Sequence, residues 1–284
     1  MMEYAALILE KLLYLYFIRL FYNFIIKSEQ QSIMDLGLLG KNAVITGASK
    51  GIGKGIALAL AMEGANIAIC ARGKEILEST QKEIQEKGVN VYAEVCDVGN
   101  RKLLNEFLEN SRNQLGSVDI LVNNVSALSF GDEDADWEAS FNIDLMASVW
   151  ATKKVVPWMI ESGGGSILNI SSISGLESGS PPSYAAAKAA VISYSKTLAV
   201  QLAPNQIRVN SIAPGSVEFE GGLWDQMKQS NPSFYDMALD SIPSGRLGTP
   251  EEIGKVVAFI VSPCASWVTG TCLSVDGGQH KFNL

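Results

Sequence analysis

A tyrosine and a lysine lie four residues apart in the run YAAAK, at Tyr184 and Lys188. Residues with this spacing project from the same face of a helix. A lysine ammonium beside a phenol favours the phenolate form, so the pair could exchange a proton with a carbonyl or alcohol oxygen. The spacing is common by chance. Here it begins a predicted helix directly after an apolar strand, at the edge where ligands bind in open parallel sheets.

Polar side chains near this pair could assist it. Ser171 and Ser172 end the strand that precedes the helix, and either hydroxyl could donate to a substrate oxygen beside Tyr184. Asn142 is a polar residue among apolar neighbours in FNIDL, on a long predicted helix. Its amide could hold a water that links Lys188 to solvent, or it could be an ordinary hydrogen-bonded core asparagine.

Other catalytic chemistries lack the residues they need. The chain has one histidine, His280, which argues against a histidine-rich metal site and against a Ser-His-Asp triad. None of the four cysteines forms a CxxC pair, as expected of small buried residues in a reducing cytoplasm. We therefore expect a cytoplasmic protein without a bound metal.

Short apolar strands alternate with helices from residue 42 onward. The strands are predicted at Asn42–Thr46, Asn66–Cys70, Val89–Val95, Val118–Asn123, Ser166–Ile170, Ile207–Ile212 and Cys272–Val275. The helices are predicted at Ile52–Met62, Lys74–Lys87, Arg101–Leu115, Trp137–Ile160, Tyr184–Leu202 and Glu251–Val261. Alternation of this kind indicates an α/β fold with a mostly parallel sheet covered on both faces. We predict a doubly wound Rossmann-type fold with seven strands.

The first thirty-three residues are apolar but differ from the rest. Glu10, Lys11 and Arg19 interrupt them, so no charge-free run reaches the roughly 18 residues of a membrane-spanning helix. We assign residues 1–33 to an N-terminal extension and residues 34–284 to a single nucleotide-binding domain. The extension is interpreted in three ways: an over-extended start ahead of Met34, a docking helix, or a membrane-surface anchor.

A glycine-rich turn follows the first predicted strand and opens the first helix. Gly47, Gly51 and Gly53 allow a tight turn and close approach of the backbone to a pyrophosphate. The helix N-terminus behind them offers free N–H groups and a partial positive charge. Placed between a strand and a helix, this turn predicts a dinucleotide site.

Two cations favour NADP(H) over NAD(H). An acidic residue at the end of the second strand would bind the ribose 2′-hydroxyl of NAD, but this strand is followed by Arg72. Arg72 can offer a fork of donors to a 2′-phosphate, and Lys50 adds a second charge from the glycine turn. Asp97, after the third strand, could accept a hydrogen bond from the adenine amino group.

The chain resembles the short-chain dehydrogenase/reductase family, and in particular its 3-oxoacyl-acyl-carrier-protein reductases. The resemblance covers about Leu38–Gly278. Its motifs are TGASKGIG (Thr46–Gly53), CDV (Cys96–Val98), NN (Asn123–Asn124), Asn142 in FNIDL, SS (Ser171–Ser172), YAAAK (Tyr184–Lys188), RVNSIAPG (Arg208–Gly215), GRLGTPEEI (Gly245–Ile253) and VDGG (Val275–Gly278).

This resemblance implies a catalytic tetrad and a cofactor site. The tetrad maps to Asn142, Ser172, Tyr184 and Lys188, with Ser172 preferred to Ser171 because it stands three residues before Gly175. It also implies a homotetramer or homodimer. The implied cofactor residues are Gly47, Ser49, Lys50, Gly51, Ile52, Gly53, Arg72, Asp97, Val98, Asn124, Tyr184, Lys188, Pro214, Gly215 and Val217.

The chain departs from the family pattern at two positions beside the implied cofactor. Ser126 replaces the glycine of the family's NNAG motif, and Phe219 stands where the family often has a threonine that helps to hold the nicotinamide carboxamide. A hydroxymethyl group at Ser126 could crowd the cofactor or supply a hydrogen bond.

The substrate is expected under a lid formed by Ser216–Ser244. The lid carries Phe219, Leu223, Trp224, Met227, Phe234 and Tyr235, which could line an apolar pocket or pack on their own domain. We expect a small ketone or alcohol substrate; the alternatives are a 3-oxoacyl-acyl-carrier-protein reductase and a non-catalytic nucleotide-sensing module. The net charge of −8 disfavours nucleic acid, anionic membranes and an acidic carrier protein.

Overall fold

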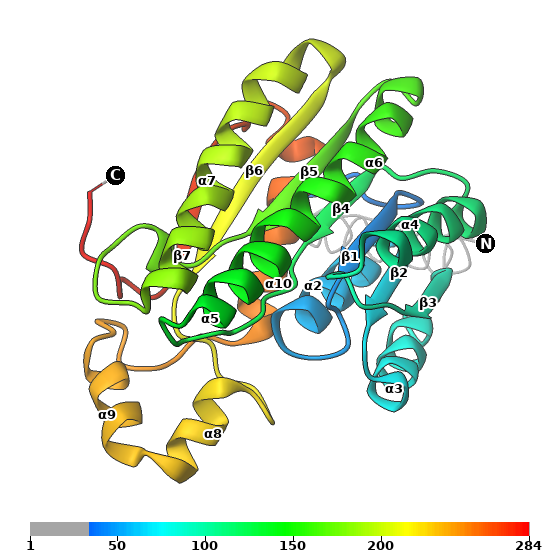
Figure 1. Ribbon diagram of the computed structural model, residues 1–284. Helices are drawn as coiled ribbons and strands as arrows, with labels where there is room; N and C mark the ends of the chain where they lie inside the picture. The colour runs from blue at the N-terminus through cyan, green and yellow to red at the C-terminus, as the bar shows by residue number, and fades with distance from the viewer. Residues whose placement is uncertain (1–33, 284) are drawn as a thin grey trace, which may run out of the picture. The chain divides into compact units, whose positions relative to one another are not determined.

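Seven parallel strands form one sheet in the order β3-β2-β1-β4-β5-β6-β7 (Figure 1). The computed structural model describes residues 34–283, so the predicted extension 1–33 lies outside it. The strands are β1 (Asn42–Thr46), β2 (Asn66–Ala71), β3 (Val91–Val95), β4 (Ile120–Asn123), β5 (Gly165–Ile170), β6 (Ile207–Pro214) and β7 (Cys272–Val275). This order confirms the predicted doubly wound fold, with a sheet that is parallel throughout.

Helices connect the strands and cover both faces of the sheet, as right-handed crossovers require. They are α2 (Gly51–Met62), α3 (Lys74–Gln85), α4 (Arg101–Leu115), α5 (Asp134–Ala139), α6 (Ala147–Glu161), α7 (Pro182–Leu202), α8 (Leu223–Ser230), α9 (Pro232–Asp240) and α10 (Pro250–Val261). Among the described residues, 34–283, no helix is long and apolar enough to cross a membrane.

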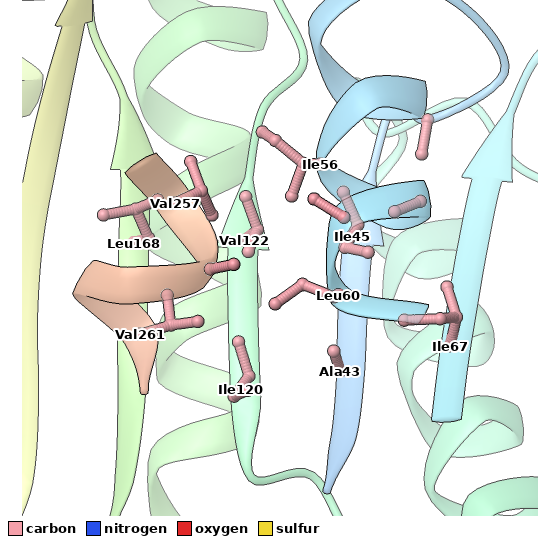
Figure 2. Packing of buried hydrophobic residues seen from close by; sticks show 14 of the residues in the cluster. Ala43, Ile45, Ile56, Leu60, Ile67, Ile120, Val122, Leu168, Val257 and Val261 are labelled. Carbon is pink, nitrogen blue, oxygen red and sulfur yellow. The ribbon is translucent and has the colours of Figure 1, made fainter. Parts of the chain in front are cut away.

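The core has two layers because successive strand residues point to opposite faces. On β1, Ile45 joins the layer beneath α2 and α10, and Val44 joins the layer beneath α4 and α6. Figure 2 shows the first layer, where side chains of α2 and α10 meet those of the central strands. The labelled residues are Ala43, Ile45, Ile56, Leu60, Ile67, Ile120, Val122, Leu168, Val257 and Val261. These central strands are buried on both faces and form a rigid base for the strand ends.

The predicted long helix Trp137–Ile160 is divided into three segments. Between α5 and α6 lies a π-helical turn, Ser140–Met146, here called η1. A π-helical turn has i to i+5 hydrogen bonds, so it shifts the face that each following residue presents. Pro157 lies inside α6 without ending it. Because η1 packs against α7, the residues of this turn are brought to the Tyr184–Lys188 pair.

The loops after β4, β5 and β6 all lie at the carboxyl edge of the sheet. The strand order reverses between β1 and β4, and ligands of such sheets bind at the carboxyl edge near this point. α7 begins at Pro182, immediately behind the loop that follows β5. A proline suits the first turn of a helix because its missing N–H has no intrahelical partner there. The lid helices α8 and α9 follow the carboxyl end of β6 (Figure 1). This edge therefore collects the predicted site residues.

Candidate active site at the carboxyl edge of the sheet

Tyr184 and Lys188 lie on the first turns of α7, with the lysine side chain buried against the end of β5. The lysine is 2% exposed, and its Nζ donates to the carbonyl oxygen of Ile170 at 3.1 Å. The same Nζ lies 5.6 Å from the centre of the Tyr184 ring. Tyr184 is itself half-buried. The structure thus brings the two side chains of the predicted proton-transfer pair together.

The two serines after β5 are used differently. The Ser171 hydroxyl donates to the Lys188 carbonyl oxygen at 2.8 Å, which ties the strand end to α7. Ser172 Oγ accepts from the backbone N–H of Ser174 at 3.2 Å and caps the short helix Ile173–Gly175. The Ser172 hydroxyl thus keeps its own proton for donation, whereas that of Ser171 is committed. The geometry favours Ser172 as the donor to substrate.

Asn142 and Asp144 both lie on η1, but they face different neighbours. The Asn142 amide Nδ2 lies 3.4 Å from the carbonyl oxygen of Gly99 and points toward the loop after β3. Asp144 instead places Oδ1 2.9 Å from Lys188 Nζ, with both side chains buried. The structure therefore brings Asp144 into direct contact with the lysine, whereas the direct contact of Asn142 is with Gly99.

Asp144 was not among the predicted site residues. The signal that could have found it is an acidic residue in the otherwise apolar run FNIDLM. Its second oxygen, Oδ2, accepts from the backbone N–H of Ala127 at 3.0 Å. Burial disfavours the ammonium of Lys188, but the charge of Asp144 and the neighbouring Tyr184 outweigh it and raise the pKa of the lysine. Lys188 is therefore held as a cation.

The glycine turn between β1 and α2 is shaped for a backbone contact with a ligand. Gly47 and Gly51 have φ angles of +67° and +56°, which side-chain-bearing residues rarely adopt. A Cβ on Gly53 would lie 2.3 Å from the Gly47 carbonyl oxygen. No side chain caps the α2 N-terminus at Lys50, so its first N–H groups have no side-chain cap and suit an anion. These features fit the pyrophosphate of a dinucleotide.

Asn124 and Ser49 hold this turn in place. The Asn124 amide donates to the carbonyl oxygens of Gly47, at 2.9 Å, and Thr46, at 3.2 Å. The Ser49 carbonyl oxygen accepts from the Thr80 hydroxyl at 2.7 Å. These two predicted cofactor residues thus have a structural use in the turn. Ile52, also predicted, lies half-buried in the first turn of α2.

Charged groups predicted to read the adenosine end lie at the ends of β2 and β3. Arg72 follows β2 with its side chain exposed, and Asp97 follows β3, also exposed. Asp97 Oδ1 accepts from the backbone N–H of Gly99 at 3.0 Å, while Val98 is buried beside it. Lys50 Nζ donates to the Gly221 carbonyl oxygen at 3.3 Å. The structure thus places two cations at the two relevant turns.

The segment after β6 covers the glycine turn. Pro214 ends β6, Gly215 follows, and the buried Val217 pairs with Gly248. The Phe219 ring lies against Gly51 so closely that a Cβ there would be 2.5 Å from its Cζ. An aromatic ring therefore packs on the turn where the predicted pyrophosphate contact is made. Ser126, the other position at which the chain departs from the family pattern, accepts a hydrogen bond at Oγ from the Leu128 N–H at 3.2 Å.

Aromatic residues form two separate groups, one beside Tyr184 and one within the lid. Phe130, in the loop after β4, meets the Tyr184 ring edge to face with centres 5.4 Å apart. In the lid, Trp224 stacks on Phe234 at 5.7 Å and meets Tyr235 at 6.5 Å. Tyr235 is buried, so these lid aromatics pack largely on one another. Phe130, which sequence reasoning missed, is the aromatic residue placed beside the phenol.

The residues described, 34–283, include no cluster of histidine, cysteine or acidic residues that could hold a metal ion.

A family model described as "Enoyl-(Acyl carrier protein) reductase" matches residues 47–280. The 3-oxoacyl-[acyl-carrier-protein] reductase of Thermotoga maritima is 40% identical over 248 residues, covering 85% of this chain and 98% of that protein. The chain belongs to the short-chain dehydrogenase/reductase family.

Solved structures of short-chain dehydrogenases agree with this fold. The L-sorbose reductase of Gluconobacter frateurii, complexed with NADPH and L-sorbose, is 34% identical, with a TM-score of 0.82 over 88% of this chain and all of that one. A 7α-hydroxysteroid dehydrogenase complexed with NADH is 34% identical, with a TM-score of 0.80 over 86% of this chain and 96% of that one. The chain is thus an oxidoreductase acting on alcohol or ketone groups with a nicotinamide nucleotide.

Proposed function

We propose that this short-chain dehydrogenase/reductase reduces a small, apolar ketone to a secondary alcohol with NADPH, and oxidises the alcohol in the reverse direction. The buried contact between Lys188 and the end of β5, beside the Tyr184 phenol, carries this proposal. Tyr184 transfers the proton to the carbonyl oxygen, Ser172 donates a hydrogen bond to that oxygen, and Lys188 holds the phenol in position. The bound nicotinamide supplies the hydride. Family membership favours this enzyme over a nucleotide-sensing module.

The cofactor is held by the glycine turn at its pyrophosphate and by the turns after β2 and β3 at its adenosine. Arg72 is exposed at the first of these, where an acidic residue would select NAD(H). The segment Pro214, Gly215 and Val217 closes over the nicotinamide end. Phe219 lies on Gly51, so it packs beside the bound cofactor or swings away to admit it.

Replacing Arg72 with aspartate should reverse the cofactor preference from NADPH to NADH. A charge-assisted contact contributes about 1.5–3 kcal/mol, so NADPH affinity should fall by about 10- to 100-fold. Lys87→Asp makes the same charge change at an exposed position just beyond the C-terminal end of α3 and should leave the ratio nearly unchanged. Dissociation constants for both nucleotides measure the effect. An unchanged ratio in Arg72→Asp would show that another residue reads the 2′-phosphate.

A free ketone is favoured over an acyl group on carrier protein. Phe130 beside Tyr184 and the aromatic lid give the entrance an apolar character suited to an alicyclic or aromatic substrate. The net charge of −8 opposes docking of an acidic carrier protein. Carrier-protein reduction remains the second candidate because of the Thermotoga maritima relative. Comparing kcat/KM for a carrier-bound 3-oxoacyl group and its free thioester separates the two.

We expect the enzyme to be a cytoplasmic homotetramer or homodimer without nucleic acid or membrane partners. The four free cysteines support a cytoplasmic location, and the net charge of −8 opposes binding to nucleic acid or anionic membranes. Size-exclusion chromatography with light scattering measures the oligomer.

A further inference from the structure

A carboxylate and an ammonium are buried together directly behind the phenol. Asp144 is 1% exposed and Lys188 is 2% exposed, and their Oδ1 and Nζ atoms lie 2.9 Å apart. Removing two charges from water is costly, and an ion pair in this setting is weak as a source of stability. Because Lys188 Nζ also lies 5.6 Å from the centre of the Tyr184 ring, this buried pair is placed to act on the phenol.

The Asp144 carboxylate is held through both of its oxygens. Oδ2 accepts from the Ala127 N–H at 3.0 Å, which ties η1 to the loop after β4. Oδ1 lies 2.9 Å from Lys188 Nζ, so the two buried side chains form an ion pair. The π-helical turn directs Asp144 toward Lys188, because it shifts Asp144 away from the helix face that it would occupy in a regular α-helix.

The charge of Asp144 changes the effect of the Lys188 ammonium on the ionisation of the Tyr184 phenol. A lone ammonium a few ångströms away favours phenolate over phenol. With Asp144 ionised beside it, the lysine and aspartate together carry no net charge, so the field of the ammonium at the phenol is largely cancelled. Phenol, and not phenolate, is the form that donates a proton to a carbonyl oxygen.

We propose that Asp144 is a positioning residue that cancels the field of the Lys188 ammonium at the phenol, so that Tyr184 stays a proton donor to higher pH and the site is set for ketone reduction. This inference rests on the proposed function for its catalytic meaning. In the reaction, a hydride adds to the carbonyl carbon, the Tyr184 proton passes to the oxygen, and the phenolate recovers a proton from water.

Other ionisable groups near the pair are at the surface or turned away. On segments packed against η1 they include Asp97 after β3, Asp136 and Glu138 on α5, Lys153 and Lys154 on α6, and Tyr194 on α7. Asp136 bonds the Ser129 hydroxyl, and Lys154 pairs with Glu109. Burial raises the pKa of Tyr194, which lies beyond Lys188 along α7. The hydroxyls of Ser171 and Ser172 complete the polar surroundings. Asp144 is the carboxylate in contact with the lysine.

Direct titration of the phenol tests the proposal without requiring a substrate. Protein labelled with ¹³C at the tyrosine hydroxyl-bearing carbon is followed by NMR against pH, and the Tyr184 signal is assigned by its loss in Tyr184→Phe. In Asp144→Asn, which keeps the size of the side chain, the Tyr184 signal should titrate about 1–3 pH units lower than in wild type. Glu138→Gln removes an exposed carboxylate from α5 and should leave that signal unchanged.

The pH profile of turnover supplies the second measurement. Ketone reduction by Asp144→Asn should begin to fall at a pH lower by the same interval, and alcohol oxidation should begin to rise at a lower pH. Tyr184 signals that titrate together in wild type and Asp144→Asn would overturn the inference, whatever the activity. A shifted signal in a protein that turns over no ketone would leave the inference standing and refute the proposed function. Thermal unfolding confirms that both variants are folded at the pH values compared.

Discussion

Phenylalanine at position 184 should lower kcat for ketone reduction by about 10²- to 10⁴-fold, the range that a positioned general acid contributes. The substitution removes only the phenol oxygen, and the ring keeps its edge-to-face contact with Phe130. NADPH should still bind, because the glycine turn and Arg72, which hold its pyrophosphate and adenosine, are untouched. Steady-state rates with a ketone series, together with the dissociation constant for NADPH, measure both effects.

Tyr194 offers the matched control for this substitution. It lies on the same helix, α7, beyond the lysine and away from the carboxyl edge of the sheet. Tyr194→Phe removes an equivalent hydroxyl and should retain turnover within a few-fold of wild type. Equal turnover in Tyr184→Phe and wild type would mean that another group supplies the proton.

Methionine at position 188 should abolish most of the activity and destabilise the fold. The substitution leaves Asp144 buried beside an apolar chain, and breaking a buried pair in this way costs about 3–5 kcal/mol of unfolding free energy. Denaturant unfolding measures the loss. Asp144→Asn combined with Lys188→Met removes both charges and should recover much of that stability but none of the activity. A Lys188→Met protein as stable as wild type would show that the pair is not ionised.

The pH dependence of this loss has a defined sign. The pKa of Lys188 is raised in the folded protein, so the contribution of its charge is complete below the usual lysine value of 10.5. That contribution is lost only as pH rises through the raised folded value. The gap in stability between wild type and Lys188→Met should therefore persist across neutral pH and close in strongly alkaline solution.

Strand and cofactor features were predictable because they depend on local pattern. Apolar runs such as Ile67–Cys70 are buried on both faces of a parallel sheet, and their alternation with helices left little choice of topology. The glycine turn was equally readable, since only glycine tolerates the φ angle of Gly51 or the close approach at Gly53.

The residue behind the lysine was not predictable because it depends on an irregular turn. Sequence reasoning placed Asn142 on a continuous helix, where one face repeats every 3.6 residues. The π-helical turn Ser140–Met146 breaks this repeat and presents Asp144 to Lys188, while Asn142 faces Gly99. A short-range sequence pattern does not reveal such a turn, because the packing of η1 against α7 holds it.

The contacts made by the lid aromatics and by Phe130 could not be predicted from the sequence either. The lid aromatics were open to two interpretations, and Trp224 packs on Phe234 and Tyr235 within the lid. Phe130 and Tyr184 are far apart along the chain, and their contact depends on how the loop after β4 folds back over α7. Long-range contacts of this kind follow from the tertiary packing of loops, for which the sequence offers no periodic signal.

Transfer of deuterium from labelled cofactor to product tests the central claim most directly. Wild-type protein is incubated with NADPH deuterated at the transferable position of the nicotinamide and with small alicyclic and aromatic ketones, and the alcohol is analysed by mass spectrometry and NMR. We predict one deuterium on the carbinol carbon, one stereoisomer of the alcohol, and almost no product from Tyr184→Phe. Alcohol without deuterium at that carbon, or formed equally well by Tyr184→Phe, would contradict hydride transfer assisted by Tyr184 and Lys188.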